Sequence, residues 1–401
     1  MTSTAMSPIE VPDETPVHGA RTLRLPLDPL LTLATIGLGI CSIVTLRVAT
    51  RKFVPGQPRY YVDRQATYLI VGLVLMVVLS RVDYSRLRHL MYGIYGALML
   101  SILAVLALGH KTALGAQRAI EFPLFSFQAS ELGKVLLILA LSAFVVNRSR
   151  RLRDLDTTAR VMLVALVPAM LVIAQPDLGS GLVYMAIAFM LLFVAGTSWR
   201  QLTALVALVA VSGAFVLVAA PAAGVHVLKP YQMERLTAFL HPSSDPKKKG
   251  AYQQEESKVA IGAGQKTGRG VNSTQIKGNY VPEDDTDFIF AAVGEQYGFV
   301  GAALVLSLYA LLIWRTLRIL TMAKDLFGSL VAAGVVAMLM FQVFVSVGMS
   351  VGIMPITGVT LPLMSYGGSS VITTLLAVGL LQSIYVQAGA SQAMKGRVYR
   401  Y

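Results

Sequence analysis

Four carboxylates, Glu283, Asp284, Asp285 and Asp287, lie within five residues at the mouth of a long apolar stretch. Carboxylates this close repel one another, so at least one is expected to hold its proton more tightly than an isolated carboxylate does. Such a group can take a proton from a hydroxyl, and the cluster can equally bind a divalent cation. A structural alternative stays open, in which Thr286 or Asp287 caps the helix that follows.

The composition indicates what surrounds this cluster. Charged residues make up 14% and hydrophobic residues 55% of the 401 residues, whereas a soluble domain carries about 25% charged residues. The sequence therefore predicts a multi-pass membrane protein with one membrane domain. Its formal charge is +13, from 34 basic and 21 acidic residues. In a membrane protein this excess reflects basic cytoplasmic loops and contact with anionic membrane lipids, so no nucleic-acid partner is expected.

Cysteine and histidine exclude several kinds of site. Cys41 is the only cysteine and lies in an apolar segment, which rules out intrachain disulfides and metal sites built from several thiolates. The histidines are scattered along the chain and show neither metal-ligand nor catalytic-triad spacing.

Ten apolar segments follow along the chain, most of them close to the roughly 20 residues that a helix needs to cross a bilayer. They fall near 27–48, 66–82, 90–109, 131–146, 160–175, 181–198, 201–221, 287–314, 328–350 and 364–388. The sequence thus predicts an all-α protein with ten transmembrane helices. The fifth and sixth are separated only by Gln175 to Ser180, which predicts a helical hairpin.

Basic residues are concentrated in alternate connections between these segments and in the C-terminal tail. The positive-inside rule places those connections, and with them both termini, in the cytoplasm. We therefore expect a disordered cytoplasmic tail at 1–25, a transmembrane domain at 26–390 and a cytoplasmic tail at 391–401. The connection 222–286, between helices 7 and 8, becomes a large extracytoplasmic loop, so the acidic cluster faces the outside.

Two patterns in the loop 222–286 suggest local structure. Apolar residues between Tyr231 and Leu240 show helical spacing, which predicts a short helix lying in the membrane interface. Gly262 to Thr267 resembles a phosphate-binding loop. It lacks a glycine directly before Lys266, follows no strand and faces a compartment without ATP, so nucleotide binding is disfavoured.

Motifs at five places are shared with one known family. They are Gly115–Arg118 with Phe127–Lys134, Gln175–Gly179, Ser257–Gly262, Pro282–Glu283 with Thr286–Phe290, and Met354–Pro355 with Leu361–Ser369. On these residues the chain resembles the SEDS family of peptidoglycan glycosyltransferases over nearly its whole length after the tail. Ser257-Lys258, Thr274-Gln275 and Gly196–Arg200 are more similar to RodA than to FtsW, which is the close alternative.

The resemblance implies polymerisation of lipid II at the outer face of the bacterial cytoplasmic (inner) membrane during cell elongation. The 4-hydroxyl of an acceptor N-acetylglucosamine attacks C1 of the donor N-acetylmuramic acid, and undecaprenyl diphosphate leaves. Asp287 matches the family's essential aspartate and is the candidate general base. Alternatively, Asp287 holds a divalent cation, Mg²⁺ or Mn²⁺, together with Glu283 and Asp285. The resemblance also implies a class B penicillin-binding protein as the transpeptidase partner.

Six further residues are candidates for substrate binding, namely Arg118, Gln128, Glu131, Lys134, Asp177 and Lys258. Glu131 and Lys134 share one helix face, and the alternative is a buried ion pair that joins two helices. Arg118 suits a phosphate or a lipid head group equally. Asp177 is equally well explained as a turn or cap residue. Lys258 either meets the diphosphate or extends toward the membrane interface.

Two rival interpretations remain. Ten helices with polar residues near the membrane also suit a flippase for lipid-linked precursors, although the sequence shows no clear inverted repeat. Within the family, an FtsW-type division polymerase is the other candidate. The segment Ser365–Ser370 is interpreted as a packing motif of small residues, and Ser365 is not assigned as a nucleophile.

Overall fold

The computed structural model describes residues 27–49, 59–109, 119–121, 126–151, 154–215, 233, 249–274 and 285–398. The described part is almost entirely helical. Its α-helices are α1 (Pro29–Ala49), α2 (Tyr60–Arg81), α3 (Met91–Leu108), α4 (Ala129–Asn147), α5 (Leu155–Ala174), α6 (Leu178–Val194), α7 (Trp199–Ala214), α10 (Lys249–Ala263), α11 (Ile289–Met322), α12 (Leu326–Val351) and α13 (Gly368–Val398). Short 3-10 helices are η1 (Tyr84–Leu90), η2 (Ser149–Arg151) and η4 (Gly270–Asn272). Strands β1 (Ile120–Glu121) and β2 (Ser126–Phe127) pair antiparallel just before α4.

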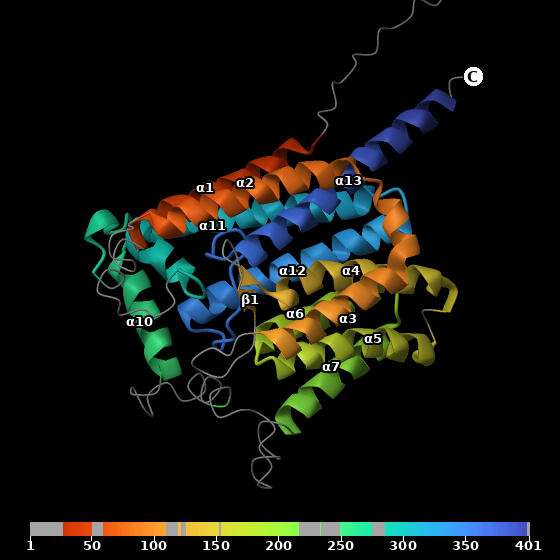
Figure 1. Ribbon diagram of the computed structural model, residues 1–401, viewed down its shortest axis with the longest axis horizontal. Helices are drawn as coiled ribbons and strands as arrows, with labels where there is room; N and C mark the ends of the chain where they lie inside the picture. Colours follow the sequence, from red (N-terminus) through yellow and green to blue (C-terminus); the bar gives the residue numbers. More distant parts are fainter. Residues whose placement is uncertain are drawn as a thin grey trace, which may run out of the picture.

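The long helices lie side by side in a bundle, with α10 lying across one end (Figure 1). α2 packs along α13, α1 along α11, and α12 against α4, α6 and α11. In both α4 and α12, 78% of the most apolar window is buried inside the protein. These two helices therefore form the centre of the bundle, as expected for helices that are apolar on nearly every face.

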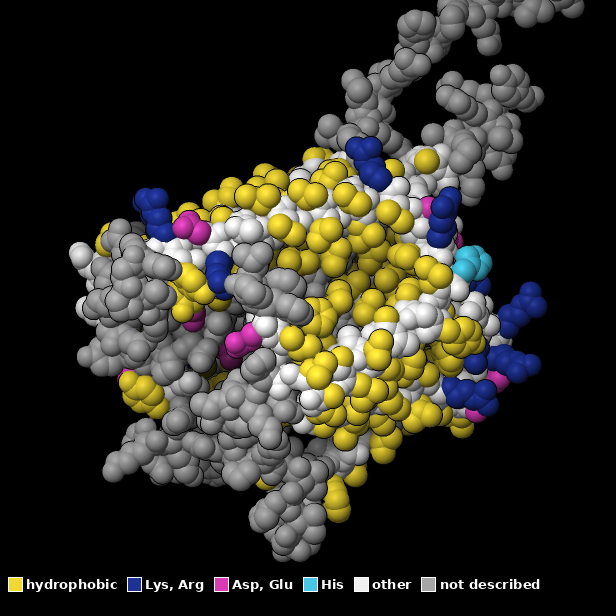
Figure 2. All heavy atoms as spheres, in the orientation of Figure 1, with side chains coloured by type: hydrophobic (Ala, Val, Ile, Leu, Met, Phe, Trp, Pro, Cys, Tyr) yellow, Lys and Arg dark blue, Asp and Glu magenta, His cyan; other side chains and the backbone are white. Residues whose placement is uncertain are grey.

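Eight of the described helices are long and apolar enough to cross a membrane by length and composition. Two shorter apolar helices, α6 and α7, coincide with the sixth and seventh expected segments. Each of the ten expected segments thus overlaps a helix, although α6 ends at Val194 rather than at 198. The chain turns there through Gly196, whose φ is +86°. Figure 2 shows hydrophobic side chains covering the flank of the bundle that faces the viewer.

α11 consists of two helices joined at Gly298, where φ is +61° and ψ is −157°. Directly after this break, the N–H groups of Phe299 and Val300 donate to the carbonyl oxygens of Gln265 and Lys266 at 2.9 and 3.1 Å. The glycine-rich segment that resembles a phosphate-binding loop therefore supplies acceptors for the first N–H groups of the second helix. This packing gives the segment a structural role.

We predict that a side chain at Gly264 destabilises the protein. A β-carbon there would lie 1.9 Å from the carbonyl oxygen of Gly294, so the helix and the loop would have to separate. We expect Gly264→Ala to lower the free energy of unfolding by about 1–3 kcal/mol, measured as a lower melting temperature of the detergent-purified protein. Gly262→Ala is the matched control, because a β-carbon at Gly262 has no heavy atom within 4 Å. Equal melting temperatures for the two variants would contradict this prediction.

α10 packs across the C-terminal end of α12, and no sequence pattern indicated this helix. Gln254 Nε2 donates to the carbonyl oxygens of Met349 and Met354 at 3.3 and 2.9 Å. Ser257 Oγ donates to the carbonyl oxygen of Ser350 at 2.8 Å. The bonds to Met349 and Ser350 occupy carbonyls that the end of α12 cannot pair internally. The interfacial helix expected near 231–240 lies outside the described residues, apart from Met233.

Asp28 joins three helices at the opposite end of the bundle. Its side chain caps α1 by accepting the N–H of Leu31 at 2.8 Å, and it forms an ion pair with Arg315 of α11. Gln382 of α13 accepts the N–H of Asp28 at 2.7 Å. The expected tail 1–25 lies outside the described residues, and α13 continues past residue 390 into the other expected tail.

Candidate functional site

Asp177 is the centre of a buried polar network between α4 and α6. Its side chain is 5% exposed. One carboxylate oxygen accepts the N–H of Ser180 at 3.1 Å, which caps α6. The other accepts bonds from Ser130 Oγ at 2.7 Å and from Gln128 Nε2 at 3.1 Å. The structure therefore brings two predicted site residues together, and three donors compensate the burial of this charge.

Glu131 and Lys134 form a buried ion pair on α4. Lys134 Nζ lies 2.5 Å from Glu131 Oε1, and the two side chains are 1% and 5% exposed for Lys134 and Glu131. The pair lies within one helix and does not itself join two helices. Tyr184 of α6 packs close beside it, donating its hydroxyl to the Ser130 carbonyl at 3.1 Å. A β-carbon at Gly133 would lie 2.0 Å from that hydroxyl, so glycine is required for this contact.

The acidic segment lies at the same end of the bundle, immediately before α11. Asp285, Thr286 and Asp287 are all partly buried. The helix has Phe288 at its N-cap position, so neither Thr286 nor Asp287 holds the cap position that the structural alternative required. The backbone of the segment is bound by the turn between α12 and α13. Tyr366 N–H donates to the Asp285 carbonyl at 2.8 Å, and Ser365 Oγ donates to the Thr286 carbonyl at 2.6 Å.

Tyr366 reaches this segment through its backbone, and its phenol is an unsuitable base. Burial raises the pKa of the Tyr366 phenol well above its ordinary value. The ring also packs edge-on against Tyr61, with the ring centroids 4.9 Å apart. A phenol of this kind keeps its proton near neutral pH, so the Tyr366 phenol is a poor candidate for a general base.

The remaining predicted residues are placed less centrally or lie outside the described part. Lys258 Nζ pairs with Glu255 Oε1 at 2.9 Å on α10, and the Lys258 side chain is 35% exposed. It lies against Gly352 at the end of α12. Arg118 and Glu283 lie outside the described residues. Within the described residues, no group of three or more metal-ligating side chains occurs, so the proposed cation site would need Glu283 or other ligands from beyond them.

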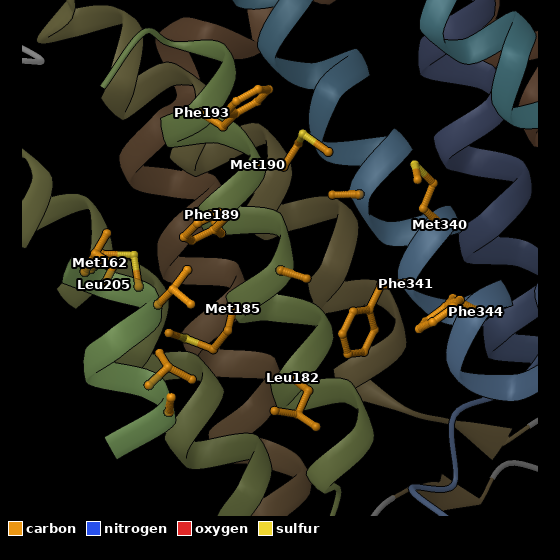
Figure 3. Close-up of a pocket in the computed structure, with 15 residues that line it drawn as sticks. Met162, Leu182, Met185, Phe189, Met190, Phe193, Leu205, Met340, Phe341 and Phe344 are labelled. Carbon is orange, nitrogen blue, oxygen red and sulfur yellow. The ribbon is translucent and has the colours of Figure 1, made fainter. Parts of the chain in front are cut away.

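A long apolar groove opens between α7 and α12, with α6 as its floor. Its volume is about 740 Å³. Figure 3 shows Leu182, Met185, Phe189 and Phe193 following one another along α6. Met340, Phe341 and Phe344 line the α12 side. The lining is suited to a flexible hydrocarbon chain, since methionine and aromatic side chains adapt to irregular apolar surfaces. Sequence alone did not indicate the groove, because its lining residues match those that face lipid.

A family model described as cell cycle protein FtsW/RodA/SpoVE matches residues 27–389. The chain belongs to this family. Peptidoglycan glycosyltransferase MrdB of Escherichia coli K12 is 35% identical over 363 residues, covering 90% of this chain and 94% of that protein. The probable peptidoglycan glycosyltransferase FtsW of Thioalkalivibrio sulfidiphilus is 35% identical over 377 residues, covering 92% of this chain and 91% of that protein.

Solved structures agree with this assignment. A chain from a study of "Structural coordination of polymerization and crosslinking by a peptidoglycan synthase complex" matches with a TM-score of 0.75 and 32% identity, covering 91% of this chain and 99% of that chain. The rod shape determining protein RodA of Thermus thermophilus matches with a TM-score of 0.63 and 29% identity, covering 90% of this chain and 97% of that chain. The SEDS resemblance and the enzyme class are therefore confirmed. Equal identity to relatives named MrdB and FtsW leaves the subtype unresolved.

Proposed function

We propose that this family member polymerises lipid II, with Asp287 as the general base. One observation carries the proposal: the segment that bears Asp287 and the buried Gln128–Asp177 network lie at one end of the bundle, and both are bound by the short segment Ser365–Ser369, where the turn after α12 leads into α13. In this proposal, Asp287 takes the proton from the acceptor 4-hydroxyl while that oxygen bonds to C1 of the donor sugar. The bond from C1 to the diphosphate oxygen breaks, and undecaprenyl diphosphate departs.

The apolar groove supports a lipid-linked substrate. A polyprenyl chain needs an uninterrupted hydrocarbon surface, and the groove between α6, α7 and α12 supplies one. Polar residues at the end of the bundle would then receive the diphosphate and the sugars. We assign Gln128 and Asp177 to this role, because their network lies beside the segment that bears Asp287. Glu131 and Lys134 lie buried on the same helix as Ser130.

The proposed topology follows the charge pattern and the helices. Ten helices cross the bacterial cytoplasmic membrane with both termini inside, and the connection 222–286 lies outside with the acidic segment. A divalent cation held by Glu283, Asp285 and Asp287 is the second proposed role of the cluster. Such a cation would neutralise charge that develops on the departing diphosphate.

We further propose a class B penicillin-binding protein as the partner and cell elongation as the process. The neighbouring solved structure concerns a complex that combines polymerization and crosslinking, which favours such a partner. Motifs at Gly196–Arg200 and Thr274-Gln275 favour the RodA-type role over the FtsW-type role. Affinity capture of the tagged protein from its own cells separates the two roles, according to whether an elongation or a division transpeptidase is recovered.

Polymerisation of purified lipid II in detergent tests the proposed activity. No membrane has to be crossed in detergent micelles, so a flippase gives no product there, whereas a polymerase makes glycan strands that are visible on a gel. We expect strands from the purified protein together with its partner. Lipid II that stays monomeric with the partner present, while the same protein moves lipid II across vesicle membranes, would favour the flippase.

A further inference from the structure

The turn between α12 and α13 is held rigidly in an unusual conformation. Leu363 within it is fully buried and has φ = +65°, a backbone conformation that a residue with a β-carbon keeps only when its surroundings enforce it. Three carbonyl oxygens of the turn accept bonds from side chains of three different helices. These bonds are Tyr309 Oη to Pro362 O at 2.5 Å, Ser42 Oγ to Met364 O at 2.7 Å and Gln65 Nε2 to Ser365 O at 3.2 Å.

This rigid turn binds the two peptide groups that precede Asp287. The Ser365 hydroxyl donates to the Thr286 carbonyl at 2.6 Å and accepts the N–H of Leu361 at 2.8 Å. The next residue, Tyr366, donates its N–H to the Asp285 carbonyl at 2.8 Å. Ser365 is 1% exposed, so water does not compete for these bonds. The backbone beside Asp287 is therefore placed by the turn as well as by α11.

The chain just after this turn, at the start of α13, binds the Gln128–Asp177 network. Ser369 Oγ accepts the N–H of Gln128 at 3.0 Å and donates to the Ser126 carbonyl at 2.6 Å. Gln128 in turn donates to Asp177 at 3.1 Å. Ser369 follows Ser365 by four positions, so one short segment connects the Asp287 peptide with the Gln128–Asp177 network. A packing motif of small residues would not require these directed bonds.

We propose that Ser365 is a positioning residue for Asp287. Its hydroxyl fixes the peptide before the acid, so that the carboxylate meets the acceptor hydroxyl at the distance that proton transfer needs. Ser365 itself touches neither substrate nor proton in this role. The inference rests on the proposed function of Asp287, and it adds that the geometry of the base is set by the turn after α12.

Ser365→Ala tests the proposal with Ser383→Ala as the matched control. Ser383 is also fully buried, and its hydroxyl donates to the Val82 carbonyl at 2.6 Å, far along α13 from the site. We expect Ser365→Ala to lower kcat for lipid II polymerisation by at least about tenfold, with KM unchanged within about twofold. Ser383→Ala should leave both constants within about twofold, and both variants should show a similar small drop in melting temperature.

Amide hydrogen exchange gives a second readout that does not depend on activity. The peptide that contains residues 285–290 should exchange faster in Ser365→Ala than in the wild type, and at the wild-type rate in Ser383→Ala. Ser365→Cys keeps the side-chain size and supplies a weaker hydrogen-bond donor. If Ser365→Ala does not fold, Ser365→Cys replaces it, with a kcat expected between the wild-type value and the tenfold lower value. If Ser365→Ala shows the wild-type kcat and the wild-type exchange rate while Asp287→Ala is inactive, the positioning role of Ser365 is overturned and the proposed role of Asp287 stands. An active Asp287→Ala would instead overturn the proposed function of the acid, while faster exchange would still support the placement of its peptide by Ser365.

Discussion

Asp287→Ala is expected to lower the rate of lipid II polymerisation by about 10²- to 10⁴-fold, the usual contribution of a positioned general base. The residue is partly buried, stands directly before the N-terminal turn of α11, and has both preceding carbonyls bound by the turn at Ser365 and Tyr366. The measurement is the rate of strand formation by purified protein with lipid II in detergent. Asp287→Asn should be equally slow, because the amide keeps the shape and loses the basic oxygen.

Asp285→Asn separates the two proposed roles of the cluster. The Asp285 backbone carbonyl binds Tyr366 N–H, and this substitution preserves that bond. If Asp287 acts as a base without a metal, Asp285→Asn should keep most of the wild-type rate, and a chelator should have little effect. If the cluster holds a cation, both Asp285→Asn and chelation should slow the enzyme strongly, with recovery on adding Mg²⁺ or Mn²⁺. Wild-type polymerisation by Asp287→Ala would exclude Asp287 from either role.

The second large effect is expected on stability, from Lys134→Met. The substitution leaves Glu131 buried without the ammonium group that lies 2.5 Å away in the native protein. Breaking a buried pair on one side costs about 3–5 kcal/mol of folding free energy. The expected result is a much lower melting temperature in detergent, together with poor recovery of folded protein.

The double variant Glu131→Gln/Lys134→Met provides the comparison. It removes both charges, and replacing a buried pair by neutral groups of similar volume is often nearly neutral for stability. We therefore expect the double variant to melt close to the wild type and well above Lys134→Met. If the single and double variants melt together, the pair does not control stability, and a role of Glu131 and Lys134 in binding substrate gains support.

The membrane helices were largely predictable, because a run of about 20 apolar residues is seldom found outside a membrane-spanning helix. The break in α11 was not. Gly298 lies in a sequence that suits one continuous helix, and the interruption depends on a tertiary contact, because the N–H groups after Gly298 bind the carbonyls of Gln265 and Lys266. α10 was missed for a related reason. Its helix is stabilised by Gln254 and Ser257 binding the end of α12, a tertiary effect that local periodicity does not record.

The carboxylate and amide side chains of the site were predictable from the sequence, and its hydroxyl groups were not. Asp177 and Gln128 stand out in a chain that is poor in polar residues, and the structure does bring them together. Ser130, Ser365 and Ser369 do not stand out, because serine in a membrane helix or beside glycine is usually there to allow close packing. Their directed bonds become visible only once segments distant in sequence meet. The predictions for Arg118 and Glu283 stay predictions, since both lie outside the described residues.

The interruption at Gly298 has a consequence for how the sequence of α11 can vary during evolution. The longer portion of α11 after Gly298 is a separate helix whose first N–H groups bind the glycine-rich segment. The short portion before Gly298 accepts the N–H of Arg269 at Glu295 O and follows the peptides that the turn at Ser365 binds. Outward-facing side chains after Gly298, such as Leu304 and Leu306, can therefore be exchanged to suit a new neighbour in the bilayer without displacing the acid, whereas the buried Tyr309, which binds the turn, cannot. Such a divided helix should therefore tolerate variation on the outward face after Gly298 and should tolerate little variation before Gly298 or at Tyr309.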